Sequence, residues 1–578
     1  MTYPHPTADQ ILALKVNAGI DDLARHERFE GATADVVQAV VEGIARFAEG
    51  EWAPLDRLGD RQGAYCANGT VTLPDGYEEA YGSYAGQGWN AISAPEEFGG
   101  QGLPFSLSAC VLENLGTANF GFSLLPLLTI GAAEAISHHA SAEQKATYLP
   151  SLLSGEWTGT MNLTEPQAGS DLGALRTIAT PIESGEHAGK YKISGTKIFI
   201  TFGEHDLAEN IVQLVLARRP DAPAGSRGIS MFIVPKFLPD ADGNRSVRND
   251  YRAVSIEHKM GIHVSPTCVM SYGDNDNCIG ELVGQENFGL RYMFTMMNNA
   301  RVNVGNQGVQ IAERATRQAV TFAQERFQSA RAGSANRDPV AIIEHPDVRR
   351  MILRMRALTE AARALLYYTT GQLDRGSTGD DAAQMRGELL VPMLKAWASD
   401  VGCEVSSIGV QVHGGMGFVE ETGAAQHYRD ARIAPIYEGT NGIQAMDLVT
   451  RKLDMGSGAP FASLMGDVSA DCPDLPGLAQ LAEDCLAVGK WMLNEASLDD
   501  RLAGSVPFCT MCATAIAGWQ LARQVNALKA DADSRADLKS TLLSFFDTHV
   551  VSAASGLKIS ASAGAKMLYD LDSGQLAG

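Results

Sequence analysis

The sequence predicts an α+β protein of several domains, arranged along the chain as helical, strand-rich, helical and again helical. At 578 residues the chain is too long for one hydrophobic core and indicates three or four domains. Helical spacing of apolar residues gives way after Trp157 to short β-branched segments, and returns at Asn287. A compact Gly-rich linker, GSGAP at 456–460, precedes the last helical stretch.

The first 155 residues show helical spacing throughout, for example in VVQAVVEGIARFAE at 36–49. Ser141 and Gln144, ahead of an apolar run, predict a helix that begins with a capping box. The longest apolar run, GFSLLPLLTIGAAEAI at 121–136, is too short to span a membrane. We interpret it as a buried pair of helices. The first residues lack a charged segment followed by an apolar core, so no signal peptide is expected.

The middle of the chain predicts a strand-rich domain of roughly 120 residues. Its expected strands are short, β-branched and separated by Gly and Pro, and they lie at 191–201, 210–219, 228–236, 253–260 and 267–273.

Helical spacing then holds from 287 to 453, with expected loops near 329–343 and 375–381. We therefore expect an N-terminal extension at 1–35, a helical domain at 36–157, a middle β domain at 158–280, a helical bundle at 281–455 and a C-terminal helical extension at 461–578.

Composition restricts the function. Apolar residues make up 45% of the chain and charged residues 20%, as in soluble globular proteins. The net charge of −22 argues against a nucleic-acid binder, and residues from 461 onward carry 8 Lys and Arg against 14 Asp and Glu. Nine scattered cysteines are typical of reduced cytosolic thiols. Cys509 and Cys512 form a Cys-x-x-Cys on an expected helix, and without a second ligand pair nearby we expect no metal site.

Several standard catalytic motifs are absent from the sequence. It has no HExxH, no GxSxG, no Walker A loop and no GxGxxG between a strand and a helix, so a Rossmann-bound nicotinamide is not expected. LTEPQAGSDLG at 163–173 combines hydroxyls with two glycines that let a backbone approach a flat ligand. A polar loop between domains would have the same composition, so both interpretations stay open.

Two arginines on one expected long helix pose a geometric question. Arg301 and Arg326 are 25 residues apart, which is roughly 37 Å along a straight helix. They cannot grip one small anion in the same chain, so they serve different ligands, reach a partner subunit, or are simply solvated.

Two further stretches suggest a site. In QVHGGMGF, 411–418, an amide and two glycines suit a backbone that closes on a pyrophosphate or a ring, while His413 is expected to be structural. In RIAPIYEGTNGIQ, 432–444, Glu438 stands between apolar residues and a tight turn, where a solvated loop acid is the plain alternative.

Together, TEPQAGSD (164–171), TKIFIT (196–201), NNAR (298–301), QER (324–326), QVHGGMGF and RDARIAPIYEGTNGIQ (429–444) resemble the acyl-CoA dehydrogenase family over about residues 80–453. The N-terminal segment and the appendage resemble its longer bacterial branch, which includes 3-methylthiopropanoyl-CoA and broad-chain fatty acyl-CoA dehydrogenases. The resemblance implies a middle β-barrel-like domain, a C-terminal four-helix bundle and an extra helical domain. It also implies an FAD enzyme that converts an acyl-CoA to the trans-2-enoyl-CoA.

The resemblance assigns the catalytic base to Glu438, because the alternative family position on the long helix is Ala300. An apolar setting should raise the pKa of this carboxyl. The backbone N–H of Glu438 is expected to donate to the thioester carbonyl. The implied substrate-binding residues are Ser170, Asn298, Arg301, Tyr437 and Gly439.

The implied FAD-binding residues fall into two sets. One lines the flavin ring, ribityl chain and nearby pyrophosphate: Leu163, Thr164, Gly169, Ser170, Phe199, Thr201 and Thr440. The other reaches the FAD of a neighbouring subunit: Arg326, Gln328, Gln411, Gly414 and Gly415.

The expected assembly is a homodimer, with a tetramer also open. We expect a cytoplasmic enzyme of fatty acid β-oxidation without a membrane span or bound metal. An electron-transfer flavoprotein is the expected electron acceptor. An acyl-CoA oxidase is the alternative, and a DNA-associated repair-type flavoprotein is a rival of another class that the acidic C-terminal extension disfavours.

Overall fold

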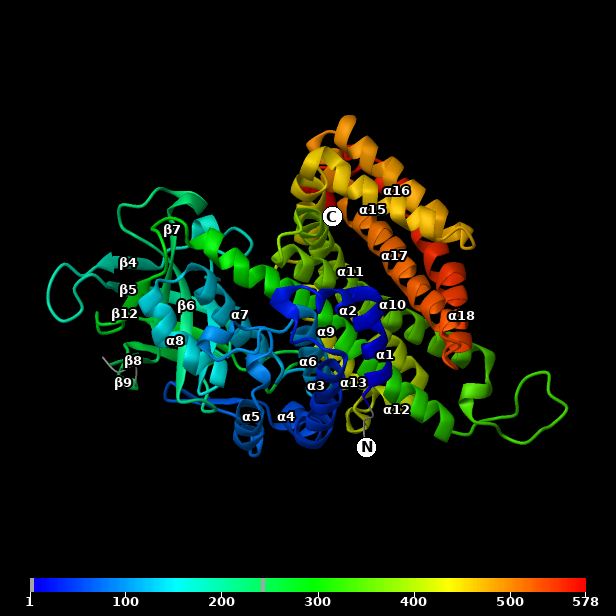
Figure 1. Ribbon diagram of the computed structural model, residues 1–578, viewed down its shortest axis with the longest axis horizontal. Coiled ribbons are helices and arrows are strands. Elements are labelled where there is room, and N and C mark those ends of the chain that lie inside the picture. The colour runs from blue at the N-terminus through cyan, green and yellow to red at the C-terminus, as the bar shows by residue number, and fades with distance from the viewer. Residues whose placement is uncertain (1–4, 241–244) are drawn as a thin grey trace. The chain divides into compact units, whose positions relative to one another are not determined.

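The computed structural model describes residues 5–240 and 245–578, and the chain forms two compact units (Figure 1). Unit 1 comprises the described residues 43–103 and 114–300, and unit 2 comprises 5–42, 104–113 and 301–578. The predicted α+β architecture, with a helical N-terminal part, a middle β domain, a helical C-terminal part and extra C-terminal helices, is confirmed. The domain limits given above stay predictions.

Residues 5–155 are helical apart from one hairpin, so the prediction of helix throughout this part was wrong at 65–72. Strands β1 (Tyr65–Ala67) and β2 (Thr70–Thr72) pair antiparallel across Asn68 and Gly69, both at positive φ. An Asn-Gly pair is the usual two-residue hairpin turn, but strands of three residues are too short to show a period. The helices here are α1 (Thr7–Ala13), α2 (Ile20–Leu23), α3 (Ala34–Phe47), α4 (Asp56–Gln62), α5 (Tyr77–Gly86), α6 (Phe105–Ala118), α7 (Leu124–His139) and α8 (Ala142–Ser154).

Two local predictions in this region have opposite outcomes. The run at 121–136 forms the single helix α7 rather than a pair, because Pro126 falls in its first turn, where a missing N–H costs little. The capping box of α8 is confirmed: Ser141 Oγ accepts from the N–H of Gln144 at 3.1 Å, and the Gln144 side chain accepts from the N–H of Ser141 at 3.1 Å.

Unit 1 is built around an 8-stranded sheet with the order β10-β11-β5-β12-β7-β6-β3, in which β4 pairs with β5 and β6. Its strands carry β-branched and aromatic residues toward a buried core that includes Ile193, Val215, Phe232 and Met270. The expected strand at 253–260 begins and ends earlier, since its β-branched residues end at Ile256. The strands of this sheet are β3 (Trp157–Asn162), β4 (Ile178–Pro181), β5 (Tyr191–Thr201), β6 (Asn210–Arg218), β7 (Ile229–Pro235), β10 (Tyr251–Ile256), β11 (Thr267–Tyr272) and β12 (Ile279–Leu282). A separate pair is formed by β8 (Phe237–Pro239) and β9 (Arg245–Arg248).

Unit 2 is a bundle of long helices. The helix α9 runs without interruption over Gly289–Glu325, and its residues from Arg301 onward belong to this unit with α10 (Pro346–Ser377) and α11 (Asp381–His413). Gly308 allows α9 and α11 to pack backbone to backbone, because a Cβ there would lie 2.0 Å from the carbonyl oxygen of Ala398. The shorter helices are α12 (Gly415–Phe418), α13 (Ala424–Ala431) and α14 (Asn441–Asp447).

The C-terminal extension packs within unit 2 around α17 (Leu498–Ala530), which contacts α10, α11 and α14. The helix α17 is long and apolar enough to cross a membrane, but most of its apolar window is buried inside the protein. Its Cys509 and Cys512 are buried on this core helix, as predicted. The remaining helices are α15 (Ala459–Asp471), α16 (Pro476–Asn494), α18 (Ala536–Phe546), α19 (Ser552–Ser555), α20 (Lys558–Ala561) and α21 (Ser573–Leu576).

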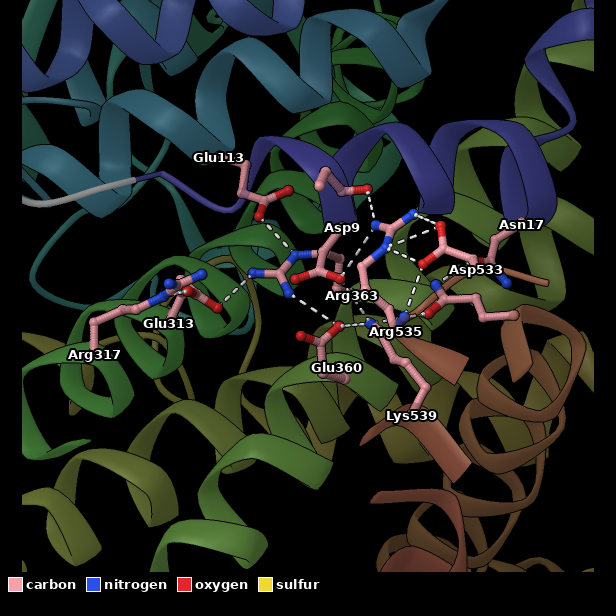
Figure 2. Close-up of polar contacts among 12 residues, drawn as sticks. Asp9, Asn17, Glu113, Glu313, Arg317, Glu360, Arg363, Asp533, Arg535 and Lys539 are labelled. Carbon is pink, nitrogen blue, oxygen red and sulfur yellow. Dashed lines mark hydrogen bonds and ion pairs between the residues drawn. The ribbon is translucent and has the colours of Figure 1, made fainter. Parts of the chain in front are cut away.

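A buried cluster of charges joins the N-terminal segment, the bundle and the extension inside unit 2 (Figure 2). Arg363 on α10 lies 2.9 Å from Glu113, 2.7 Å from Glu313 and 3.3 Å from Glu360. Glu360 also accepts a 2.5 Å hydrogen bond from Lys539 on α18. Burial would raise the pKa of Glu360, but Lys539 and Arg363 outweigh it and hold that pKa at about 2.

The N-terminal helices are tied to the extension by the same cluster and by buried amides. Lys539 lies 3.1 Å from Asp9 on α1, and Asn17 donates to the side chain of Gln520 on α17 at 3.1 Å. Because these groups are far apart in the sequence, no local pattern could predict that the two ends of the chain pack together.

Candidate active site

Glu438 lies on a tight turn of unit 2 between α13 and α14. Its φ is +57°, and that of Gly439 is +80°. Left-handed backbone is routine for glycine but costs a residue with a side chain of order 1–3 kcal/mol. Such outliers persist only where neighbouring contacts hold them, and they gather at functional sites. The turn is therefore the first structural reason to regard this acid as more than a solvated loop residue.

Several side chains hold the turn in place. Lys395 on α11 donates from Nζ to the carbonyl oxygen of Gly439 at 2.8 Å. Gln444 on α14 donates from Nε2 to the carbonyl oxygen of Glu438 at 3.1 Å. Tyr437 donates from its hydroxyl to Gln307 on α9. Glu438 and its two neighbours are thus fixed to three different helices.

Asn441 connects the turn to α11 a second time. Its side-chain oxygen accepts from Lys395 at 2.9 Å, and its amide nitrogen donates to Ala396 O at 2.9 Å and to Ser399 Oγ at 3.0 Å. Thr440 accepts from the N–H of Ile443 at 3.2 Å and so caps α14. Its predicted role at the pyrophosphate stays a prediction.

The pKa of Glu438 suits a base that works near neutral pH. Burial raises the pKa of its carboxyl to about 7, against the opposing effect of Arg301 and Lys395, whose charges lower it. Ile436 is 48% exposed, so the apolar setting expected from the sequence does not come from this neighbour, whose side chain faces outward. Tyr437 is partly buried, and burial likewise raises its pKa.

The predicted substrate-binding residues are divided between the two units. Arg301 is buried on α9 and is close enough to Glu438 for the two charges to interact. Tyr437 and Gly439 flank Glu438 directly. Asn298 is exposed on α9 one turn before Arg301, and Ser170 is exposed in unit 1, where it belongs to another part of the predicted site.

In unit 1, the loop after β3 and the end of β5 bring four of the predicted flavin-lining residues together. The N–H of Ile198 donates to the carbonyl oxygen of Thr164 at 2.9 Å, and Lys197 Nζ donates to that of Leu163 at 3.0 Å. Phe199 and Thr201 follow on β5. Gly169 and Ser170 lie beyond a turn in which Glu165 and Ala168 exchange backbone hydrogen bonds.

Glu165 anchors this loop and has a structural role. Its carboxylate accepts hydrogen bonds from the N–H of Arg176 at 2.6 Å, the N–H and hydroxyl of Thr177 at 3.0 and 2.6 Å, and Lys197 at 2.9 Å. Burial would raise the pKa of Glu165, but these partners lower it to about 2.

Phe199 presents an aromatic ring to solvent from an unusual backbone position. The pairing of β5 with β11 shifts register between Lys197 and Ile200, and in this bulge Phe199 takes a φ of +60° and is 58% exposed. Bulges beside active sites commonly redirect a side chain. An exposed ring held in a strained bulge, on the strand whose Ile198 N–H bonds the backbone of Thr164, suits a flat heteroaromatic ligand.

The other predicted FAD-binding residues lie at one end of the unit 2 bundle. His413 at the end of α11 stacks on Phe322 near the end of α9, with ring centroids 4.4 Å apart. This contact brings the two exposed groups together: Arg326 and Gln328 after α9, and Gln411, Gly414 and Gly415 at the end of α11. His413 is structural, as expected, and burial lowers its pKa.

This end is remote from Glu438 along the same helix. Tyr437 contacts Gln307, whereas Arg326 comes 19 residues later, roughly 28 Å along α9. The uninterrupted helix bears out the sequence argument that Arg301 and Arg326 are too far apart to hold one small anion.

The sequence reasoning missed Lys395 altogether. One feature could have revealed it: a lone Lys within the apolar helical run VPMLKAWAS at 391–399. Among the residues that the structure describes, no group of three or more His, Cys, Asp and Glu side chains is placed to hold a metal ion.

Comparison with known families is consistent along the chain. Residues 35–156, 160–274 and 287–453 match the models of the acyl-CoA dehydrogenase N-terminal, middle and C-terminal domains. Residues 475–572 match the model described as acetyl-CoA dehydrogenase C-terminal like.

Individual relatives agree with these matches. The chain is 47% identical to 3-methylmercaptopropionyl-CoA dehydrogenase of Ruegeria pomeroyi, over 92% of each chain. It is 31% identical to a broad-specificity linear acyl-CoA dehydrogenase of Mycobacterium tuberculosis, also over 92% of each. Among solved structures, an acyl-CoA dehydrogenase from Bacillus anthracis complexed with FAD matches with a TM-score of 0.74 at 22% identity, over 93% of this chain and 90% of that one.

Proposed function

This chain belongs to the acyl-CoA dehydrogenase family of FAD-dependent oxidoreductases, and we propose that Glu438 is the base with which it removes the α-proton of an acyl-CoA thioester. One observation carries the assignment: the carboxyl group is held on a strained, left-handed turn fixed by α11 and α14, where burial raises its pKa to about 7. A general base works best when its pKa lies near the working pH. The alternative position is Ala300, which has no titratable group.

The residues present fit FAD. In unit 1, the exposed ring of Phe199 and the nearby Thr164 and Thr201 offer a flat face and hydroxyl donors for the flavin and its ribityl chain. In unit 2, the exposed Arg326 supplies a cation suited to a pyrophosphate. Gly414, at φ +59°, has open space where a Cβ would stand, so its backbone can approach a ligand. FAD, when bound, accepts the hydride that leaves the β-carbon.

The chain's own groups account for the proton half of the reaction. Glu438 in its carboxylate form takes the α-proton, which leaves negative charge on the thioester oxygen. The N–H of Glu438 is proposed to donate to that oxygen, and a donor fixed in advance lowers the cost of the developing charge. Arg301 and Asn298, one turn apart on α9, are proposed to contact the substrate.

We further propose 3-methylmercaptopropionyl-CoA, or an acyl-CoA of similar length, as the substrate. The support is the identity of 47% to the Ruegeria pomeroyi enzyme of that name, against 31% to the broad-specificity linear acyl-CoA dehydrogenase. α,β-Dehydrogenation of this thioester would give the corresponding enoyl-CoA with the sulfur on the β-carbon.

The remaining proposals concern the setting of the enzyme. We propose a cytoplasmic homodimer in which Arg326, Gln328 and the 411–415 segment contact the FAD of the partner subunit. The exposed apolar residues Phe327, Met416 and Phe418 beside them support an interface at this end of the bundle. An electron-transfer flavoprotein is the proposed electron acceptor, and fatty acid oxidation the proposed pathway class.

Anaerobic titration with a panel of acyl-CoA thioesters tests the proposal. The flavin absorbance of the purified holoenzyme should bleach with 3-methylmercaptopropionyl-CoA at lower concentrations than with long-chain acyl-CoA. Equal bleaching across the panel would favour the broad-chain alternative. Rapid peroxide formation by the reduced enzyme in air would instead indicate an oxidase.

A further inference from the structure

Lys395 lies at the centre of α11 with no exposed surface, within the apolar run 391–399. Burial lowers the pKa of its ammonium to about 8. Burying a cation is unfavourable in free energy unless it is well hydrogen-bonded. An apolar residue of similar volume would often stabilise the fold equally well or better at such a position. A lysine in this position calls for a reason other than stability.

The contacts of Lys395 converge on the turn that carries Glu438. The ammonium donates to the carbonyl oxygen of Gly439 at 2.8 Å and to the side-chain oxygen of Asn441 at 2.9 Å. The first bond fixes the peptide group directly after Gly439, and the second fixes the residue at the start of α14. The strained backbone of Glu438 therefore has a rigid anchor on its C-terminal side.

We propose that Lys395 is a positioning residue for the catalytic base: it holds the Glu438–Gly439 turn against α11 and places a positive charge near the carboxylate. This inference rests on the proposed role of Glu438. It gives α11 a role in proton removal, the positioning of the base, which is separate from the roles proposed for Glu438 and for the flavin-lining residues.

The charged groups that face Glu438 determine how the loss of Lys395 would change the pKa of the Glu438 carboxyl. Arg301 from α9 and Lys395 from α11 both lower the pKa of Glu438. Lys395 in turn faces Asp400, which favours its charged form, and Arg301, which opposes it. Arg301 also faces Asp447 on α14 and Arg451 after it. Removing Lys395 takes away one of the two cations that lower the pKa of Glu438 and leaves Arg301, so the pKa of Glu438 rises.

The test uses Lys395→Met, which is unbranched and only one atom shorter than the lysine and removes its charge and donors. Lys395→Arg is the conservative rescue. Lys539→Met is the matched control, because Lys539 is also buried in unit 2 but bonds to Glu360 in the charge cluster. Where Lys395→Met does not fold, Lys395→Gln replaces it, since its amide keeps a hydrogen-bond donor but carries no charge.

The measurement is exchange of the α-hydrogens with deuterated solvent in an acyl-CoA whose β-carbon is replaced by sulfur. Such a thioester has no β-hydrogen, so hydride transfer cannot occur and the exchange reports the base alone. We expect the FAD content of Lys395→Met to equal that of the wild type. Exchange should slow about 10- to 100-fold, since small misplacements of a reacting group have effects of this order. In the pH profile of the exchange rate, the acidic limb of Lys395→Met should lie about one pH unit higher than that of the wild type.

Lys395→Arg should return the limb to the wild-type position, and Lys539→Met should lower the melting temperature without moving the limb. The positioning role is overturned if Lys395→Met keeps the wild-type rate and limb, or if it slows exchange by the same factor at every pH and leaves the limb in place. Glu438→Gln in the same assay separates the two proposals. If Glu438→Gln still exchanges at the wild-type rate, the base assignment fails and this inference fails with it.

Discussion

Lys197 on β5 bonds Glu165 at 2.9 Å from a side chain that has no exposed surface, and the same ammonium donates to the carbonyl oxygen of Leu163 at 3.0 Å. Burial lowers the pKa of Lys197 to about 8, although Glu165 opposes this shift. The pair fixes the loop after β3 against the strand that carries Phe199. It therefore links the interior of unit 1 to the residues proposed to line the flavin.

Lys197→Met should loosen FAD. The substitution leaves the Glu165 carboxylate buried without its cation, and hydrogen bonds to charged groups are worth about 1.5–3 kcal/mol each. We expect the dissociation constant for FAD, measured from the fluorescence of released flavin, to rise at least tenfold. Lys192→Met on the same strand is the control, since Lys192 pairs with Asp276 at the surface. Equal FAD affinity in both variants would contradict the anchoring role.

The pH dependence of kcat/KM should show an acidic limb near pH 7. Only the carboxylate form of Glu438 accepts a proton, and its pKa is raised to about 7. Activity is therefore full above this pKa and falls about tenfold per unit as the pH drops below it. Steady-state rates at low substrate concentration from pH 5 to 9 would measure the limb. A limb at the ordinary pKa of a glutamate would show that the base is not held in this environment.

Breaking the buried charge cluster should destabilise the protein strongly. Lys539→Met leaves Glu360 and Asp9 without their shared cation, and removing one partner of a buried ion pair typically costs 3–5 kcal/mol. Arg350→Met is the control, because the pair of Arg350 with Asp347 is largely exposed and contributes at most about 1 kcal/mol. Thermal unfolding followed by circular dichroism would compare the two. A smaller loss of melting temperature in Lys539→Met than in the control would argue against a cluster that joins the two ends of the chain.

Arg326→Ala should lower FAD occupancy while Arg331→Ala, a surface arginine of the following loop, should not. Co-expression of Arg326→Ala with Glu438→Gln then tests whether the site is shared between subunits. In a mixed dimer, one site combines an intact Glu438 with the partner subunit's intact Arg326, so FAD binding and activity should return. Absence of complementation in isolated mixed dimers would contradict the cross-subunit proposal.

The sequence predicted the parts of the fold and site that depend on local pattern. Strand β5 was placed at its observed limits because its β-branched residues alternate with Gly and polar residues, and the capping box of α8 was read from two residues. The hairpin at 65–72 was missed because its strands are shorter than a period can reveal.

Contacts between distant segments could not be read from the sequence. The residue pairs Lys395 with Gly439, Lys197 with Glu165, and Asp9 with Lys539 are separated by tens to hundreds of residues. Likewise, the sequence indicated that Glu438 is unusual, but not that its backbone is left-handed. That conformation depends on tertiary contacts with α9, α11 and α14.

The most direct test of the account is anaerobic reduction of the flavin in Glu438→Gln, mixed with 3-methylmercaptopropionyl-CoA in a stopped-flow spectrometer. The amide is nearly the same size as the carboxyl but cannot accept the α-proton. We expect the purified variant to carry a full complement of yellow FAD and to bleach at least 10³-fold more slowly than the wild type. Bleaching of the variant at the wild-type rate would contradict the assignment of Glu438 as the base.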